Sequence, residues 1–254
     1  ELANLMVGRP VDLTPNRSIS TAGANVLSVT DLNIHDFAGR AIIKNLNLDI
    51  KAGEILAIAG VQGNGQTELV RAIMNLGENI TGSVKLEGVE ILGKSVNQTL
   101  NSGIAYIPES REVDGLIGSF TIAENLILDT HDTKPFASLG QLSATDIASN
   151  ATALKKEFDI RAQSIFDTAN SLSGGNKQKV VLARELSRTV KLVIAAQPTR
   201  GLDVGSIEFV HERLLAERNA GRAVLLISTE LDEVTALADR IAVIYKGEIL
   251  GVVD

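Results

Sequence analysis

The stretch GVQGNGQTEL, residues 60 to 69, matches the phosphate-binding loop pattern G-x-x-x-x-G-K-[ST] at every fixed position except one. Where the pattern requires lysine the chain has Gln66, so the ammonium that reaches the β and γ phosphates is missing. Thr67 keeps a hydroxyl that could ligate Mg²⁺. On its own this stretch fits an ordinary glycine-rich strand-to-helix turn equally well. The residues expected to contact phosphate are Gly60, Gly63, Asn64, Gly65, Gln66 and Thr67.

A second stretch has residues that could bind a phosphate at the start of a helix. Residues 171 to 185 are SLSGGNKQKVVLARE, a helical pattern that opens with a hydroxyl and two glycines. A simple N-cap would explain the same residues, because serine is a favoured cap. The strand and loop LVIAAQPTRGLDVGS follow at 192 to 206. The residues at the helix opening are Ser173, Gly174, Gly175 and Asn176.

The elements that must position these loops alternate along the chain. Apolar runs, several of them continuous as in strands buried on both faces, lie at 26–32, 54–60, 103–108, 191–196, 223–228 and 241–245. Helical patterns lie at 66–76, 174–188, 205–218 and 230–238. A repeated alternation of strand and helix predicts an α/β fold with a mainly parallel sheet.

One region departs from this alternation. Residues 121–159 show no strand pattern but two helical ones, IAENLIL and SATDIASNATALKKEFDI. Ser143 and Asp146 predict a capping box at the start of the second helix. We therefore expect a helical lobe, about residues 119–170, inserted into the α/β core. The pieces expected to form antiparallel strands are 26–50 and 82–93.

The composition is that of a globular protein. The 254 residues are 44% hydrophobic and include no cysteine, which rules out disulfides and cysteine-ligated metals. A net charge of −7 argues against a nucleic-acid partner. No apolar run approaches the roughly 18 residues of a membrane-spanning helix. Residues 1–25, with Pro10 and Pro15, predict a linker from a preceding domain, and the start without Met suggests a piece of a longer protein.

The order of the motifs resembles the nucleotide-binding domain of ATP-binding cassette (ABC) transporters, from about Val26 to the C-terminus. The phosphate loop comes first, then an LSGG-type signature, then a strand that ends before Pro-Thr, then Gly-Leu-Asp. The resemblance implies a P-loop fold of ABC type over residues 26–254, with a mainly parallel core, an antiparallel β subdomain and an inserted helical lobe.

The resemblance also implies roles for single residues. In that family the strand before Pro-Thr ends in Asp-Glu, which support Mg²⁺ and polarise the attacking water. The chain has Ala196 and Gln197 there. Thr229 stands where the family has its switch histidine, and Glu109 where it has a glutamine. Phe37 is placed to stack on adenine, although a core or turn position would explain it equally well.

Four groups on the hydrolytic side are therefore replaced, whereas the signature and the loop with Asp203 remain. ABC domains pair head to tail, with each ATP between the phosphate loop of one domain and the signature of the other. We expect no intact catalytic residue and weak binding of ATP or ADP, with Thr67 as the Mg²⁺ ligand if the ion binds. The resemblance also implies that residues 173–176 serve the ATP of a partner domain, with Asp203 at the dimer seam.

Longer stretches of the sequence resemble one particular group of ABC transporters. ELANLMVGRP resembles the junction between the two halves of tandem ATPases in sugar-type importers, and PESREVDGL, LSGGNKQKVVLARELSR and PTRGLDVGSIE resemble their second half. AAQPTRGLDVG with GNGQTEL resembles their nucleoside branch, which uses BMP-type binding lipoproteins. The implied partners are the first nucleotide-binding domain of the same polypeptide, membrane permease subunits and, indirectly, an extracytoplasmic solute-binding protein. The implied location is peripheral, on the cytoplasmic side of the cell membrane. Residues 115–120, GLIGSF, are either a permease contact or a buried loop-helix junction.

Two alternatives stay open at this point. The chain could be a competent ATPase that uses Glu109 or Glu230 as the base. It could also be an interaction module that donates its signature and binds no nucleotide itself. A soluble ABC protein of DNA repair or translation is disfavoured by the acidic net charge.

Overall fold

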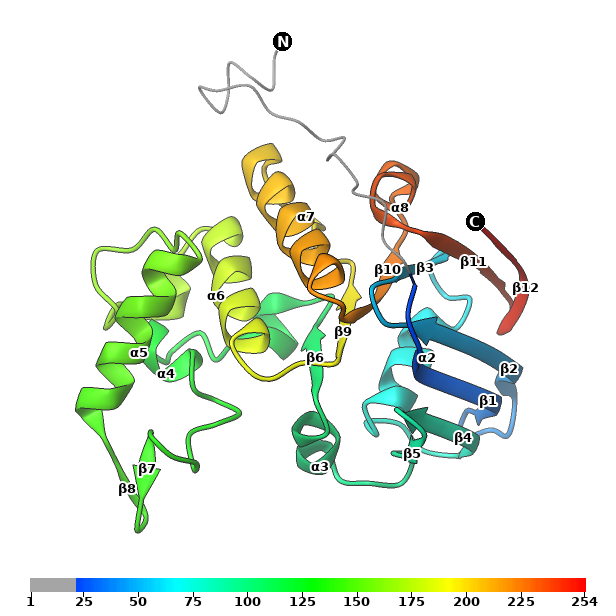
Figure 1. Ribbon diagram of the computed structural model, residues 1–254, viewed down its shortest axis with the longest axis horizontal. Coiled ribbons are helices and arrows are strands. Elements are labelled where there is room, and N and C mark those ends of the chain that lie inside the picture. Colours follow the sequence, from blue (N-terminus) through cyan, green and yellow to red (C-terminus); the bar gives the residue numbers. More distant parts are fainter. Residues whose placement is uncertain (1–21) are drawn as a thin grey trace.

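The computed structural model describes residues 22–254, which form two β-sheets and a helical lobe beside them (Figure 1). Residues 1–21, and with them most of the predicted linker, lie outside the described residues. The predicted α/β class is confirmed, with a mainly parallel central sheet and an antiparallel subdomain.

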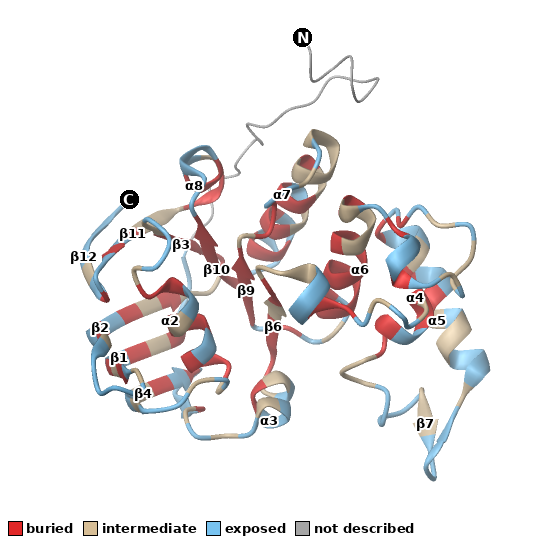
Figure 2. Cartoon of the chain, turned by 180° about the vertical axis from the view of Figure 1, so that it is seen from behind, coloured by how far each residue is buried: buried red, intermediate tan, exposed pale blue. Residues whose placement is uncertain are grey.

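The central sheet has six strands in the order β12-β11-β3-β10-β9-β6. Its members are β3 (Ile55–Ala59), β6 (Ile104–Ile107), β9 (Leu192–Ala196), β10 (Ala223–Ser228), β11 (Arg240–Tyr245) and β12 (Glu248–Val253). All neighbouring strands are parallel except β12, which runs antiparallel to β11 at the edge. Strand β12 was not predicted. Figure 2 shows the inner strands almost wholly buried, as their continuous apolar runs require.

A second, antiparallel sheet has the order β2-β1-β4-β5. It consists of β1 (Asn25–His35), β2 (Ala41–Lys51), β4 (Ile80–Leu86) and β5 (Val89–Glu90). Because side chains alternate along a strand, β3 serves two cores. Leu56 and Ile58 pack with this second sheet and α2 (Gln66–Ile73), whereas Ile55 and Ala57 pack with the helices on the opposite face.

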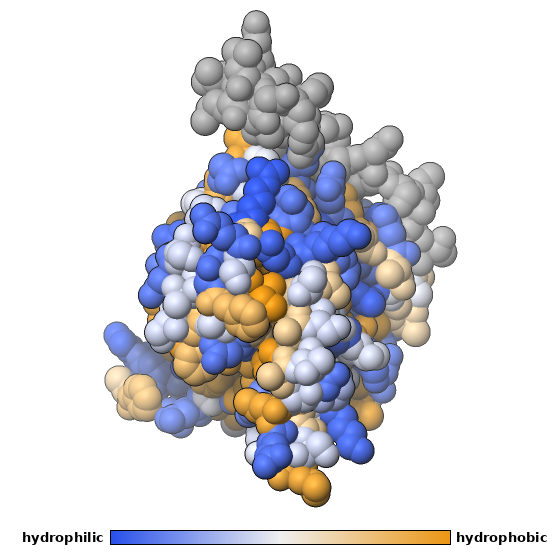
Figure 3. All heavy atoms as spheres, turned by 90° about the vertical axis from the view of Figure 1, so that its left-hand side faces the viewer, coloured by the Kyte–Doolittle hydropathy of each residue, from blue (hydrophilic) through white to orange (hydrophobic). Residues whose placement is uncertain are grey.

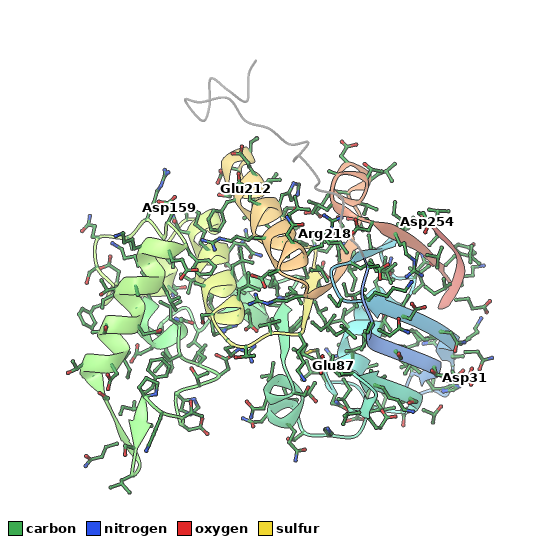
Figure 4. The ribbon with its side chains drawn as sticks, viewed as in Figure 1. Asp31, Glu87, Asp159, Glu212, Arg218 and Asp254 are labelled. Carbon is green, nitrogen blue, oxygen red and sulfur yellow. The ribbon has the colours of Figure 1, made fainter. Side chains whose placement is uncertain are left out.

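The helices on that opposite face follow the predicted pattern closely. They are α6 (Gly174–Leu186), α7 (Val204–Asn219) and α8 (Leu231–Leu237), and a short α3 (Val96–Asn101) precedes β6. Arg218 lies on α7 (Figure 4), and its guanidinium forms an ion pair with Asp239. The phosphate-loop helix is shorter than predicted and ends at Ile73. Asn75 adopts a left-handed backbone there, and its amide donates to Ile91 O and Thr99 Oγ1.

The lobe contains α4 (Ile122–Asn125), α5 (Ala144–Glu157) and the short turn η2 (Ala169–Ser171). The expectation of no strands in this region was wrong, because β7 (Ala137–Ser138) and β8 (Gln141–Leu142) form a small hairpin around Leu139 and Gly140, both with positive φ. The capping box at α5 is incomplete. Ser143 accepts from the Asp146 backbone N–H, but its own N–H donates to Phe136 O, so the Asp146 carboxylate accepts the Ser143 hydroxyl instead.

Candidate functional site

The glycine-rich loop leaves the centre of the sheet, between the buried strand β3 and helix α2. Gly63 and Gly65 have φ of 87° and 108°, in the left-handed region that favours glycine. Gly60 is required for another reason, since a Cβ there would lie 2.7 Å from Ile244 O on β11. The glycines therefore set a tight turn that is packed against the neighbouring strand.

The side chain of Gln66 is buried and bonds within the loop itself. Its Oε1 accepts from the Asn64 N–H at 3.1 Å, and its Nε2 donates to Val61 O at 3.1 Å. The amide therefore ties two main-chain groups of the loop together. It brings no positive charge, and it already occupies one N–H that could otherwise face a phosphate.

Asn64 fastens the same loop to the last hairpin of the chain. Its Oδ1 accepts from Lys246 N at 2.8 Å, and its own carbonyl accepts from Gly247 N at 3.0 Å. The sequence placed Asn64 in the loop but gave no sign of this contact, because the hairpin partner strand β12 was not predicted.

A pocket beside the loop brings together residues from the C-terminal ends of several parallel strands. Gln66 and Thr67 follow β3, Glu109 follows β6, and Thr229 follows β10. The sequence reasoning missed Tyr106 at this place; burial is the main cause that raises its pKa to about 12, so it remains a neutral phenol at pH 7. The residues lining the pocket are Gln62, Gly63, Gln66, Thr67, Val70, Tyr106, Glu109, Ala196, Gln197, Ile227 and Thr229.

Two uncharged side chains meet where a base and a switch residue would be needed. Gln197 Oε1 lies 3.3 Å from both the backbone N and the hydroxyl of Thr229, which donate to it. Neither side chain can take a proton from water at neutral pH. The adjacent Ala196 presents only a buried methyl group. The two side chains therefore join the ends of β9 and β10 through hydrogen bonds between neutral groups.

The carboxylates considered as substitutes are poorly placed for that role. Glu109 lines the pocket but forms an ion pair with Arg200, and Glu230 is exposed at the start of α8. For Mg²⁺, which prefers several oxygen ligands, Ala196 offers none, and Glu109 is paired with Arg200, whereas Thr67 keeps a hydroxyl at the pocket. These residues fit a resident Mg²⁺ poorly.

Phe37 lies away from the pocket, on the turn between β1 and β2. Its ring is 92% exposed, which excludes the alternative of a core aromatic. Asp36 holds the turn by accepting from the N–H groups of Ala38 and Arg40. Phe37 lines a groove of the surface together with Thr67, so the structure brings the expected adenine and phosphate contacts to adjoining places.

The predicted signature forms the N-terminus of α6. Ser173 is its N-cap and is exposed; it accepts from Asn176 Nδ2 at 2.9 Å and from the Asn176 N–H at 3.4 Å. Gly175 lies where α6 meets α7, since a Cβ there would overlap the Ser206 hydroxyl. The second glycine of the signature is therefore needed for helix packing as well as for access.

Asp203 caps α7 next to the signature. Its carboxylate accepts from the Ser206 N–H at 2.9 Å and from the Ser206 hydroxyl at 2.8 Å. Burial opposes ionisation, but these bonds outweigh it and hold the pKa of Asp203 below its ordinary value of 3.8. A lowered pKa in the folded state means that the stabilisation is present above the unfolded pKa and is lost as pH falls through the folded one.

We expect Asp203→Ala to lower the free energy of unfolding by about 1 kcal/mol at pH 7, the usual cost of a lost N-cap. The difference from the wild type should shrink as pH falls below the ordinary value of 3.8 and through the lower pKa of the folded state, where the wild-type carboxylate becomes protonated. Urea unfolding of both proteins at pH 7 and pH 3 measures this. Asp203→Asn is the matched control, because it keeps a cap without the charge. A loss for Asp203→Ala that is the same at both pH values would contradict the assignment.

A buried network links the loop after β9 to α8. Glu233 Oε1 accepts from the Thr199 hydroxyl at 2.8 Å and lies 3.1 Å from His211 Nε2 on α7. All three residues are buried. The loop that carries Gln197 and Asp203 is therefore fixed to α8, which begins shortly after Thr229. No sequence motif predicted this contact.

A parallel sheet with a glycine-rich loop between a buried strand and a helix, together with the antiparallel subdomain, defines a nucleotide-binding cassette of the P-loop class. Residues 43–200 match the family model described as ABC transporter. The chain belongs to the ABC transporter family. None of the helices in residues 22–254 is both long and apolar enough to span a bilayer.

Individual proteins support the assignment. The chain is 46% identical over 254 residues to the nucleoside import ATP-binding protein NupA of Lactococcus lactis subsp. cremoris, and 44% identical to the guanosine import ATP-binding protein NupO of Bacillus subtilis. It is 32% identical over 251 residues to a ribose import ATP-binding protein, RbsA, of Oceanobacillus iheyensis. These matches cover 99 to 100% of the chain and 49 to 50% of each relative, so the chain spans about half the length of the curated relatives it matches.

Solved structures show the same fold. A nucleotide-free ATP-binding cassette from an ABC transporter superposes with a TM-score of 0.77 at 19% identity, covering 90% of this chain and 91% of that one. A dimeric cassette, MJ0796, bound to ADP and Pi superposes with a TM-score of 0.76 at 22% identity, covering 90% and 98%.

Proposed function

We propose that the chain is the degenerate nucleotide-binding half of an importer ATPase that energises uptake of nucleosides or simple sugars. It binds ATP or ADP weakly at its own phosphate loop, does not hydrolyse it, and donates its LSGGN signature to the ATP held by a partner domain. The observation that carries this proposal is the pocket in which the lysine, aspartate, glutamate and histidine of the family are all replaced: Gln66, Ala196, Gln197 and Thr229.

The names of the relatives favour the substrate class. NupA and NupO are named for nucleoside and guanosine import, and RbsA for ribose import. Because the chain matches about half of each, we propose that its partner is the first nucleotide-binding domain of the same polypeptide. The match of its motifs to the second half of such ATPases supports this order, with residues 1–25 as the linker and 26–254 as the domain.

Permease subunits are the proposed partners on the membrane side, which places the protein peripherally on the cytoplasmic face of the cell membrane. Residues 115–120 are the proposed contact. Leu116 is buried, but Ile117 and Phe120 are each 40% exposed, so the segment combines an anchor with an accessible apolar surface. Figure 3, in which the lobe faces the viewer, shows further hydrophobic residues at the lobe tip, where Leu139 and Leu142 are exposed. The solute-binding protein would act through the permease, without touching this chain.

Nucleotide binding by the chain itself is tested by thermal unfolding. ATP at about ten times its dissociation constant should stabilise the wild type by about 1.4 kcal/mol and raise Tm by about 3–6 °C. Phe37→Ala should leave Tm without nucleotide unchanged, because the ring is 92% exposed, and should remove most of the ATP-dependent rise.

Phe166→Ala is the matched control, because this ring is 65% exposed but lies outside the groove, and it should keep the full ATP-dependent rise. A wild-type chain whose Tm does not respond to ATP would favour the module that binds no nucleotide. Steady ATP hydrolysis by the chain alone would favour the competent enzyme and overturn the proposal.

A further inference from the structure

We infer that Arg111 is a phosphate-binding residue, which the chain donates together with its signature to the γ-phosphate of the nucleotide on the partner domain. This inference rests on the proposed function, in which the signature faces that nucleotide. It adds a charged side chain to a site whose expected residues, Ser173 to Asn176, carry no charge.

The position of Arg111 is set by a turn that leaves the central sheet. The residue opens the π-helical turn η1 (Arg111–Gly115), shortly after β6. Its Nη2 lies 2.9 Å from where a Cβ of Gly174 would be, and its Nη1 donates to Arg200 O at 2.9 Å. The guanidinium therefore lies against the first residue of α6 and beside the loop that leads to Asp203.

Arg111 forms no salt bridge among the described residues, although its charge acts on the carboxylate of the adjacent Glu112. The two neighbouring cations are paired: Lys177 Nζ lies 2.9 Å from Glu112 Oε1, and Arg200 forms an ion pair with Glu109. Within residues 22–254 Arg111 has no carboxylate partner, and its buried Nε has no hydrogen-bond acceptor. The nearby Asp203 carboxylate accepts from Ser206 instead.

A guanidinium that bonds to a main-chain carbonyl but to no carboxylate can still bind a phosphate. Helix α6 has 13 residues, so the unpaired N–H groups of its first turn and its dipole favour an anion at its N-terminus. Gly174 has no side chain between the backbone of the helix start and the guanidinium, and an arginine fork can bind two oxygens of one phosphate. The terminal phosphate of ATP, with the most charge and three free oxygens, is the matching ligand, whereas ADP lacks it.

The test uses the complete protein with both nucleotide-binding halves. Arg111→Ala should lower kcat for ATP hydrolysis about 10- to 100-fold and weaken ATP binding at the partner site by about 10-fold or more, while ADP binding changes less than about twofold. Arg111→Lys keeps the charge but not the forked guanidinium, so its kcat and ATP affinity should lie between those of the wild type and of Arg111→Ala. Arg161→Ala is the matched control, since that side chain is 80% exposed on the lobe, and it should leave all of these values unchanged.

A purely positioning role gives a different result. If Arg111 only holds the Arg200 carbonyl, Arg111→Ala should weaken ATP and ADP binding equally, and this outcome would overturn the inference. Ser173→Arg distinguishes a failure of the donated signature from a failure of the Arg111 role alone. If Ser173→Arg abolishes hydrolysis but Arg111→Ala changes neither kcat nor ATP binding, only the role of Arg111 fails. If Ser173→Arg has no effect, the donated signature fails, and the inference fails with it.

Discussion

Ser173→Arg in the complete two-domain protein should lower kcat for ATP hydrolysis at least about 100-fold, the effect of losing a donor that acts on developing charge in an enclosed site. Ser173 is exposed at the N-terminus of α6, where an arginine would lose the cap and fill the space in which a partner's phosphate must lie. Steady-state ATPase assays on the purified protein measure this effect. Nucleotide binding at this chain's own phosphate loop should persist, because that loop lies between β3 and α2, whereas Ser173 is at the start of α6.

The control for this change lies two residues away. Ser171 is also exposed, but it belongs to the turn η2 and its hydroxyl bonds to Thr168 O. Ser171→Arg introduces the same side chain outside the signature and should retain most of the hydrolysis. Equal losses in the two variants, or a large drop in Tm for Ser173→Arg, would mean that the helix start is structural and that no signature is donated.

The second prediction is a gain of ATP hydrolysis at this chain's own site. Restoring all four groups, Gln66→Lys, Ala196→Asp, Gln197→Glu and Thr229→His, should raise hydrolysis at this chain's own site at least about 100-fold, while each single change should give less than about 10-fold. The scaffold for these groups remains, since the side chains at 197 and 229 already lie 3.3 Å apart and both line the pocket with Gln66. Single changes should raise hydrolysis little, because the aspartate that supports the metal, the glutamate base and the lysine that binds the phosphates act as one unit.

Hydrolysis at the restored site is best measured with the catalytic glutamate of the partner half replaced by glutamine, so that only this site contributes. The matched control is Glu109→Gln in the otherwise unchanged chain. If Glu109 is held by its ion pair with Arg200 and is not the base, that variant should show no loss of turnover in the complete protein with an unaltered partner half. A loss there would support the competent enzyme with a substitute carboxylate. A fourfold variant that folds, binds ATP and stays inactive would mean that the silent site differs by more than these side chains.

Much of the fold was predictable because its signals are local. The inner strands are continuous apolar runs, and α6 and α7 begin at the side-chain caps Ser173 and Asp203, so these elements were located to within two or three residues. The elements that the sequence did not predict depend on distant partners. Strand β12 exists because β11 offers it an edge, and the hairpin of β7 and β8 has only two residues in each strand. Helix α2 ends early because Asn75 bonds to residues 16 and 24 positions further on.

By itself the sequence determined the class of protein, the order of its motifs and the residue types at the four positions where we propose replacements, because these depend on residue types at fixed spacing. Only the tertiary structure decided which contacts these residues make and which other residues lie beside them. Gln66 turns back into its own loop, Phe37 is free of the core, and Arg111 lies against a helix that begins 63 positions later. The physical reason is that hydrogen bonds, charge pairing and exposure depend on which groups the folded chain brings within a few ångströms of each other, and a linear spacing does not specify that.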